Sequence, residues 1–374
     1  MAAPTEEQTL LRDAARAWTQ DRSPVAALRR IRDASGDLGF DAALWREMVE
    51  MGWAGVVIPE AYGGSDFGYR GLGLILEETG RTLTASPLLS CALTATALML
   101  GGSDAQKGLW LPKIAAGEVV GALAIDEGAH HAPDQTALSA TNTGDGYLLT
   151  GAKTFVMEGM AADLFVVAAR AAGRPGEIAG ISLFLVAADT PGVSRTALKL
   201  ADSRGYAQLA FDEVEVESDA LLAGGHDTLE RTLDRARAGL SAEMLGMASQ
   251  AFEVTLDYLK TRRQFGQLIG SFQALQHRAA KMYAELELSR SAVEAALTAI
   301  DDDSRNVSEL AALAKARMGE TLHLISDEMV QMHGGIGMTD AHDAGLYLKR
   351  ARVAEAAFGG QTYHRDRYAV IHGY

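Results

Sequence analysis

Apolar residues in the first part of the chain recur at the three- and four-residue spacing of amphipathic helices. The positions that follow this spacing are Leu10, Leu11, Ala14, Ala15 and Trp18, and then Leu44, Met48 and Met51. A further helical stretch is expected from about residue 71 to residue 101, with a boundary at Pro87 because proline cannot continue a helix. Ser103 is suited to cap one more short helix. The pattern therefore predicts an N-terminal helical domain over residues 1–118.

Residues 119–222 change to short runs that are rich in β-branched and aromatic residues. These runs, each bounded by Gly, Asp, Asn or Pro, are VVGALAI, YLLTG, LFVVAAR, ISLFLVA and QLAFDEVEVE. Gly144-Asp145-Gly146 has the composition of a hairpin turn between residues 136–142 and 147–149. Because no helical stretch of about 10–15 residues separates the runs, a parallel βαβ sheet is disfavoured. We expect a middle domain that is a small antiparallel barrel or sandwich.

From about Asp227 onward the apolar period is helical again. One stripe steps by three and four along a single long helix and consists of Leu229, Leu233, Ala236, Leu240, Met244, Met247 and Ala251. Further helices fit residues 270–300, 306–332 and 343–357. Four long helices with short connections predict a C-terminal bundle over residues 223–374. The fold class is therefore α+β and mostly α, in three domains.

Composition and charge narrow the classes of function. The 374 residues carry 34 Lys and Arg against 49 Asp and Glu, a net charge of −15, which argues against a nucleic-acid-binding face. Cys91 is the single cysteine, so an intrachain disulfide and a cysteine metal cluster are excluded. We interpret His130-His131 as an exposed polar loop and expect no metal. The opening segment lacks a signal-peptide pattern, and no apolar stretch of about 18 residues occurs, so a cytoplasmic chain without a membrane span is expected.

The common nucleotide-binding and hydrolase motifs are absent, namely G-x-G-x-x-G, G-x-x-x-x-G-K-[ST], H-E-x-x-H and G-x-S-x-G. Two other segments carry chemistry. The first, RRQFGQLIGSFQ at residues 262–273, places arginines, a ring and amides at a corner between two helices. Arginine suits phosphate oxygens, and glutamine suits a purine edge or a ribose. The alternative is a helix corner with a surface ion pair.

The second segment is QMHGGIGMT at residues 331–339, where a helix runs into closely spaced glycines. Glycines allow a backbone to approach a ligand closely, and exposed amides can bind phosphate. The alternative is an ordinary helix C-cap, where glycine is common.

Taken in order along the whole chain, several segments resemble the acyl-CoA dehydrogenase family of flavoproteins. They are IPEAYGGSDFG, EETGRTLTASPL, LTGAKTFV, LAFDEVEVESDALLAGG, YLKTRRQFGQLIGSFQALQHRAAKM and QMHGGIGMTDAHDAGLYLKRARV. The resemblance implies an N-terminal helical domain, a small β-domain and a C-terminal four-helix bundle. It also implies FAD-dependent dehydrogenation of an acyl-CoA thioester: a base removes the α-proton, and hydride passes from Cβ to flavin N5. Hydrogen bonds to the thioester carbonyl would stabilise the developing enolate.

The resemblance also assigns cofactor and substrate residues. FAD bound mainly by a neighbouring subunit would contact Arg263, Phe265, Gln273, Gln331, Gly334 and Gly335. The isoalloxazine ring would lie near Ile125, Asp126, Phe155 and Val156. Phe155 and Met157 replace the family's tryptophan and hydroxyl residue, so flavin contacts there would depend on the backbone. Asp234 and Arg237 match positions that meet the CoA portion or the active-site floor, with a helix ion pair as the alternative.

The catalytic base is where the chain departs from the family. The usual glutamate precedes a glycine after the last long helix, but residues 356–360, AAFGG, contain no carboxylate. A minority of members carry the glutamate on the first bundle helix, where Ala236 stands here. Glu243 lies two turns further along that helix, roughly 10 Å away, and is our candidate base. The alternatives are a structural Glu243 paired with an arginine, or a base at Asp126, Glu158, Asp340 or Glu355.

Two functions stay open. The chain is either an active acyl-CoA dehydrogenase with a displaced base, or an FAD-binding, catalytically incomplete subunit of a heteromeric enzyme that acts on bulky, for example steroid-derived, acyl-CoA. Both imply a role in lipid or steroid catabolism. Both imply a homotetramer or a heterotetramer with a paralogous subunit, and electron-transfer flavoprotein as the acceptor. The acyl group itself is not indicated.

Overall fold

The computed structural model describes residues 5–34 and 36–374. Residues 1–4 lie outside the described residues; they belong to the opening segment in which no signal-peptide pattern is expected. The described chain forms two compact units, each assembled from segments that are distant in sequence. Unit 1 contains the residues up to Leu28, Tyr69–Thr84 and Arg237–Tyr374, and unit 2 contains Arg29–Gly68 and Ala85–Ala236.

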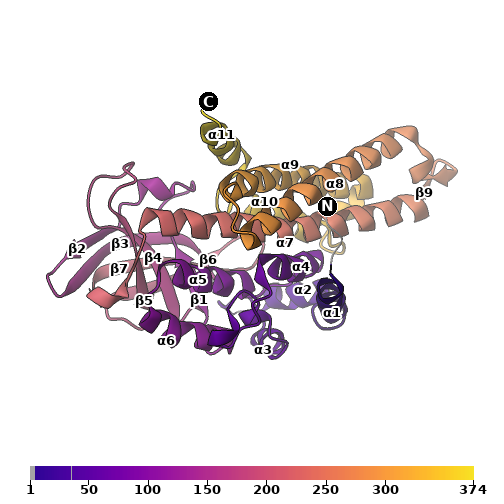
Figure 1. Ribbon diagram of the computed structural model, residues 1–374. Helices are drawn as coiled ribbons and strands as arrows, with labels where there is room; N and C mark the ends of the chain where they lie inside the picture. Colours follow the sequence, from indigo (N-terminus) through magenta and orange to yellow (C-terminus); the bar gives the residue numbers. More distant parts are fainter. Residues whose placement is uncertain (1–4, 35) are drawn as a thin grey trace. The chain divides into compact units, whose positions relative to one another are not determined.

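The sheet of unit 2 has eight strands, seven of them in the order β6-β7-β3-β2-β4-β5-β8, with β1 paired to β4 (Figure 1). The strands are β1 (Gly121–Ala124), β2 (Ser139–Asn142), β3 (Gly146–Met157), β4 (Leu164–Arg170), β5 (Ile181–Ala187), β6 (Val193–Lys199), β7 (Gly205–Glu217) and β8 (Leu221–Leu222). The predicted hairpin between β2 and β3 is confirmed, and the amide of Thr143 donates to the carbonyl of Gly146 at 3.0 Å.

Most strand pairs are antiparallel, as expected, but β1 and β2 each pair with β4 in parallel. The connection of residues 125–138 returns the chain so that β2 runs in the direction of β1, and β3 reverses it before β4 begins. The sheet is therefore mixed. Its core consists of buried residues from facing strands, including Leu149, Val156, Phe165, Phe184 and Leu209.

The helices of the N-terminal region are α1 (Glu6–Arg22), α2 (Val25–Asp33), α3 (Ala42–Glu50), α4 (Gly68–Arg81), α5 (Leu88–Gly101) and α6 (Asp104–Ala115). Pro87 stands directly before α5, so the predicted boundary is confirmed. Ser103 caps α6 in a capping box, in which its hydroxyl accepts from the amide of Gln106 at 3.2 Å.

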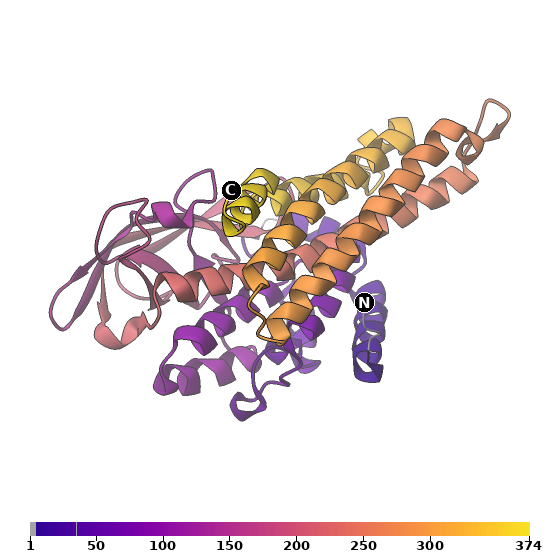
Figure 2. The ribbon, with the colours of Figure 1, turned by 45° about the horizontal axis from the view of Figure 1, so that its top comes forward.

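The C-terminal helices are α7 (His226–Thr261), α8 (Gln273–Asp301), α9 (Val307–His333), α10 (Ala344–Ala356) and α11 (Gln361–Ile371). The first four are the helices expected from the apolar period, and α11 is an addition. In unit 1, α8 and α9 run side by side and antiparallel (Figure 2). Ser289 and Thr321 hydrogen-bond across this pair at 2.8 Å, and Arg278 pairs with Glu328. The loop between α7 and α8 carries a short hairpin of β9 (Arg263–Gln264) and β10 (Gln267–Leu268).

Within residues 5–34 and 36–374, no helix is both long and apolar enough to cross a membrane.

Candidate functional site

Strand β3 is irregular where the predicted flavin residues lie. Its register against β7 shifts between Lys153 and Val156. Phe155 and Glu158 have φ angles of +52° and +53°, a conformation that is uncommon for residues other than glycine. Phe155 is 43% exposed, whereas Val156 and Met157 are buried. Bulges and left-handed residues of this kind are typical of functional sites, because they turn one side chain out of the sheet.

The bulge is held against the segment that follows β1. The amide of Thr154 donates to the carbonyl of Asp126 at 2.7 Å. The buried amine of Lys153 donates to the carbonyl of Ile125 at 2.9 Å and to Glu127 at 2.7 Å. Burial lowers the pKa of Lys153, and the nearby Glu127 carboxylate opposes that shift. These contacts bring the predicted flavin residues after β1 together with those at positions 155–156 of β3, in one place in unit 2.

Glu158 anchors the other end of the bulge. Its side chain is 2% exposed and accepts a hydrogen bond from the hydroxyl of Ser90 at 2.6 Å. The guanidinium of Arg204 lies 3.6 Å from the same carboxylate and donates to the carbonyl of Ser86 at 3.1 Å. Glu158, considered above only as a possible base, therefore ties the bulge of β3 to the start of α5. Nothing in the local sequence indicated this tie.

The expectation for the histidine pair was wrong in part. The side chain of His131 is 2% exposed, and its Nδ1 lies 2.9 Å from Asp126. It is a buried partner of Asp126, because the loop folds back onto the end of β1, and not a solvent-exposed residue. Among the residues that the structure describes, no group of three or more His, Cys, Asp or Glu side chains could hold a metal ion.

In unit 1, the first predicted nucleotide segment forms the β9–β10 hairpin. Arg263 pairs with Leu268 across the hairpin, and Phe265 stands at its turn with φ +54° and 89% of its surface exposed. Gln273 is the first residue of α8 and is also exposed. The segment thus presents a guanidinium, an aromatic ring and an amide outward, a set that fits the phosphates and base of a nucleotide.

The second segment lies at the same end of unit 1. Helix α9 ends at His333, whose ring lies 4.4 Å from that of Tyr258 near the end of α7. Gln331, Gly334 and Gly335 are exposed, and Gly334 has φ +63°. A Cβ atom at either glycine would meet nothing within 4 Å, so the backbone there is open to a ligand. The donor groups of both segments therefore fit a dinucleotide such as FAD.

The candidate base is in an ion pair. Glu243 and Arg350 are both buried, and Oε1 of Glu243 lies 2.8 Å from Nη2 and 3.2 Å from Nε of Arg350. A structural Glu243 paired with an arginine was one of the alternatives given above, and the structure has this arrangement. The role of Glu243 as a base stays a prediction.

The other predicted residues differ in their surroundings. Asp234 and Arg237 are buried one turn apart on α7. Arg237 lies over the ring of Tyr363, with Cζ 5.8 Å from the ring centre and Nη2 3.4 Å from the hydroxyl. The carboxylate of Glu355 lies 3.0 Å from Nδ1 of His323 and accepts a hydrogen bond from Nη1 of Arg352 at 2.6 Å. Asp340 is exposed.

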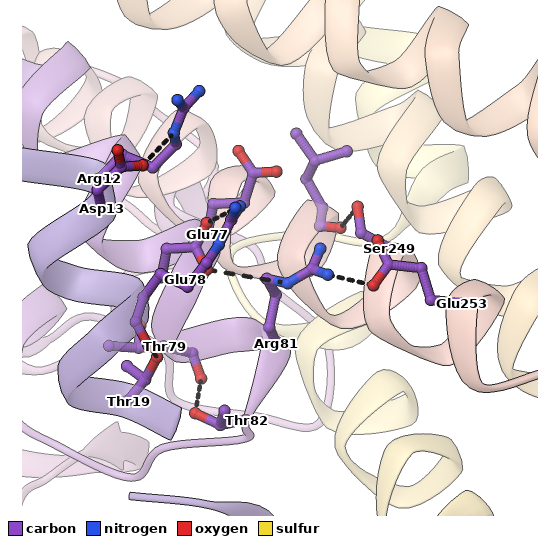
Figure 3. Close-up of polar contacts among 12 residues, drawn as sticks. Arg12, Asp13, Thr19, Glu77, Glu78, Thr79, Arg81, Thr82, Ser249 and Glu253 are labelled. Carbon is purple, nitrogen blue, oxygen red and sulfur yellow. Dashed lines mark hydrogen bonds and ion pairs between the residues drawn. The ribbon is translucent and has the colours of Figure 1, made fainter. Parts of the chain in front are cut away.

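Unit 1 also contains a cavity of about 1150 Å³ that is lined mainly by α1, α4, α7 and α8, with Leu310 of α9. Arginines on its wall are paired with carboxylates (Figure 3). The pairs are Arg16 with Glu78 at 2.8 Å, Arg290 with Glu77 at 2.7 Å, and Arg81 with Glu253. Because these charges neutralise one another, the cavity is a network that joins helices and offers no concentrated charge to a ligand.

Comparison with known proteins agrees with this organisation. Three family descriptions match in sequence: the acyl-CoA dehydrogenase N-terminal domain over residues 5–118, the middle domain over 125–218 and the C-terminal domain over 223–370. The chain belongs to the acyl-CoA dehydrogenase family of oxidoreductases, whose members generally depend on FAD. The boundaries predicted at residues 118 and 222 stay predictions.

Several relatives are similar over nearly their whole length. The acyl-CoA dehydrogenase FadE27 of Mycobacterium tuberculosis is 32% identical over 332 residues, which is 86% of each chain. The structure of a variant of the Tcur3481–Tcur3483 steroid ACAD superposes with a TM-score of 0.89 at 32% identity, covering 98% of this chain and 97% of that one. The ChsE4–ChsE5 complex from Mycobacterium tuberculosis gives a TM-score of 0.91 at 28% identity, covering 99% and 98%.

Proposed function

We propose that this chain takes part in the FAD-dependent α,β-dehydrogenation of an acyl-CoA thioester. The observation that carries the proposal is the strained bulge at Phe155 in a chain that matches the family from end to end. When bound, FAD supplies the acceptor for the hydride that leaves Cβ. Contacts of Lys153 and Thr154 with Ile125 and Asp126 hold the bulge in place, so the backbone of Val156 would be fixed where it could contact the isoalloxazine ring.

FAD is held in two places in this proposal. Ile125, Asp126, Phe155 and Val156 lie beside the isoalloxazine ring. The second place is formed by exposed residues of the β9–β10 hairpin, the start of α8 and the end of α9, which hold the phosphates and adenosine of FAD bound on a neighbouring subunit. These residues are Arg263, Phe265, Gln273, Gln331, Gly334 and Gly335. Each FAD site is thus completed by a second subunit, and the proposed assembly is a homotetramer or a heterotetramer with a paralogous subunit. Electron-transfer flavoprotein is the proposed acceptor.

The substrate meets α7. Asp234 and Arg237 contact the CoA portion or the floor of the site, and Arg237 is kept in place by Tyr363. Glu243 accepts the α-proton only if its carboxylate leaves Arg350 when the substrate binds. That requirement is costly, because a buried guanidinium would lose its partner.

A second candidate function follows from this cost. The ion pair of Glu243 and the lack of a carboxylate at residues 356–360 favour an FAD-binding, catalytically incomplete subunit of a heteromeric enzyme. The comparisons are consistent with it, since one similar structure is a ChsE4–ChsE5 complex and another is described as a steroid ACAD. In this form, a paralogous subunit supplies the base, and a bulky acyl-CoA is the substrate.

One experiment separates the two candidates. The chain is purified alone and together with a paralogue that carries the usual glutamate, and each sample is mixed anaerobically with straight-chain and steroid-derived acyl-CoA. Loss of the flavin's visible absorbance in the chain alone supports a displaced base. Loss only in the mixed assembly supports the incomplete subunit. A preparation that holds no flavin in either form would overturn the proposal itself.

A further inference from the structure

Lys315 of α9 is a buried amine that the proposed chemistry does not use. It is 1% exposed, and its Nζ lies 3.0 Å from the carbonyl of Glu355 and 2.9 Å from the carbonyl of Gly359. Both acceptors are backbone oxygens, one at the end of α10 and one in the connection to α11. Two carbonyl acceptors match the two hydrogens of a neutral amine.

The connection that Lys315 holds is a tight turn at residues 357–360. Phe358 and Gly359 are successive residues with φ of +55° and +99°. Nε2 of His364 lies 3.0 Å from the carbonyl of Phe358. A Cβ at Gly359 would lie 2.5 Å from Cδ1 of Tyr363, so the turn packs directly on that ring. Glycine adopts such a conformation freely, but a phenylalanine keeps it only when its surroundings fix it.

Tyr363 links this turn to the substrate arginine. Its ring contacts Gly359, and its hydroxyl and ring face the guanidinium of Arg237 at 3.4 Å and 5.8 Å. A continuous set of contacts in unit 1 therefore runs from the amine of Lys315 through the turn and Tyr363 to Arg237.

The charges around the amine decide its protonation. Burial is the main cause that lowers the pKa of Lys315 to about 7; Arg237 of α7 acts in the same direction, and Glu355 of α10 opposes it. His364 and Tyr363 of α11 face the same turn. Opening the turn would hydrate the amine and restore its ordinary affinity for a proton. The closed turn is therefore favoured as the pH rises above 7.

We propose that Lys315 is a positioning residue, which fixes the turn at residues 357–360 and, through Tyr363, the Arg237 guanidinium that meets the acyl-CoA. The assignment of Arg237 to the substrate rests on the proposed function. The restraint on the turn does not depend on it.

The test compares Lys315→Met, which removes both donors, with Lys315→Gln, which keeps a neutral NH₂ group. Lys349→Met, at an exposed position of α10, is the matched control. Amide hydrogen exchange of residues 357–364 is measured from pH 6 to pH 9 and corrected for the intrinsic exchange rate. Protection in the unaltered chain should rise with pH. In Lys315→Met, the protection of residues 357–364 should be about tenfold lower, because two buried carbonyls lose their donor. Lys315→Gln should keep most of the protection but lose its dependence on pH.

Affinity for acyl-CoA in the FAD-loaded assembly is measured on the same variants. We expect the affinity for acyl-CoA to fall about tenfold in Lys315→Met, which corresponds to about one hydrogen bond, and to be unchanged in Lys349→Met. This result supports the inference that Lys315 positions Arg237 through the turn and Tyr363. Protection in Lys315→Met equal to that of the unaltered chain would overturn the proposal, and so would a pH dependence that survives in Lys315→Gln. If no preparation binds acyl-CoA, the proposed function fails, and the exchange data alone then decide whether Lys315 fixes the turn.

Discussion

Replacing Lys315 by methionine should change how the stability of the chain depends on pH. The amine has a pKa of about 7 in the folded chain and an ordinary value of 10.5 when hydrated. Below pH 7 both states carry the charge, and the folded state bears the full penalty of burying it. Between pH 7 and 10.5 the unfolded chain binds a proton that the folded chain does not, so the free energy of unfolding rises with pH.

The size of this effect follows from the same two values. Each pKa unit corresponds to about 1.4 kcal/mol, and the amine is half deprotonated at its folded-state pKa, so its contribution to the free energy of unfolding should grow by roughly 2 kcal/mol between about pH 7 and pH 9. Methionine has a similar length and cannot titrate. The difference in the free energy of unfolding between the unaltered chain and Lys315→Met should therefore increase across that range, whatever its sign at neutral pH.

The assay is denaturant unfolding at several pH values, with Lys349→Met as the control. The free energy of unfolding of the control, plotted against pH, should run parallel to that of the unaltered chain, because the side chain of Lys349 is exposed to water in the folded state. If the curves of Lys315→Met and the unaltered chain are parallel, the amine of Lys315 has the same pKa in the folded and unfolded states, and the predicted pH dependence is refuted.

Three further predictions test other parts of the structure. Gly359→Ala should lower the free energy of unfolding by about 1–3 kcal/mol, because Gly359 has a positive φ and an added Cβ would press on Tyr363. Gly360→Ala should change it little, because an added Cβ there would lie 4.0 Å from the carbonyl oxygen of Glu355. Equal losses for the two variants in thermal denaturation would contradict this. Arg263→Ala should weaken FAD retention by about 1.5–3 kcal/mol, as measured by flavin release during gel filtration at several concentrations. Glu243→Gln should destabilise the chain by about 3–5 kcal/mol in denaturant unfolding, because Arg350 loses a buried carboxylate. If Glu243 is also the base, turnover by the folded fraction should fall on the order of 100- to 10,000-fold.

Local features of the fold could be predicted because their causes are local. Pro87 and Ser103 mark helix starts through backbone sterics and capping, and the 144–146 turn fixes a hairpin through its own composition. Strand β6 and helix α11 were missed for the same reason. Exposed residues interrupt the alternation of β6, and α11 buries little besides His364. Neither segment shows an apolar period strong enough to be recognised.

Pairings between distant segments could not be predicted from a single sequence. The parallel pairing of β1 with β4 depends on how the 125–138 connection returns, which no periodic pattern encodes. The tie between Ser90 and Glu158 spans 68 positions, and that between Lys315 and Glu355 spans 40. Buried polar groups like these look, in a sequence, the same as exposed ones.

The position of Glu243 shows how this limit bears on function. Glu243 lies two turns from Ala236 on α7, and its carboxylate is buried. Burial disfavours the charged form of a carboxylate, which is one way in which a protein tunes a base. Burial alone, however, does not distinguish a base from half of an ion pair. The distinction depends on Arg350, 107 positions away, which occupies the carboxylate at 2.8 Å. A base must be able to accept a proton from the substrate, whereas a carboxylate held by a buried guanidinium gains most by staying charged. The ion pair therefore favours the second of the two proposed functions, in which a partner chain removes the α-proton and this chain contributes the bulge at Phe155 and Arg237.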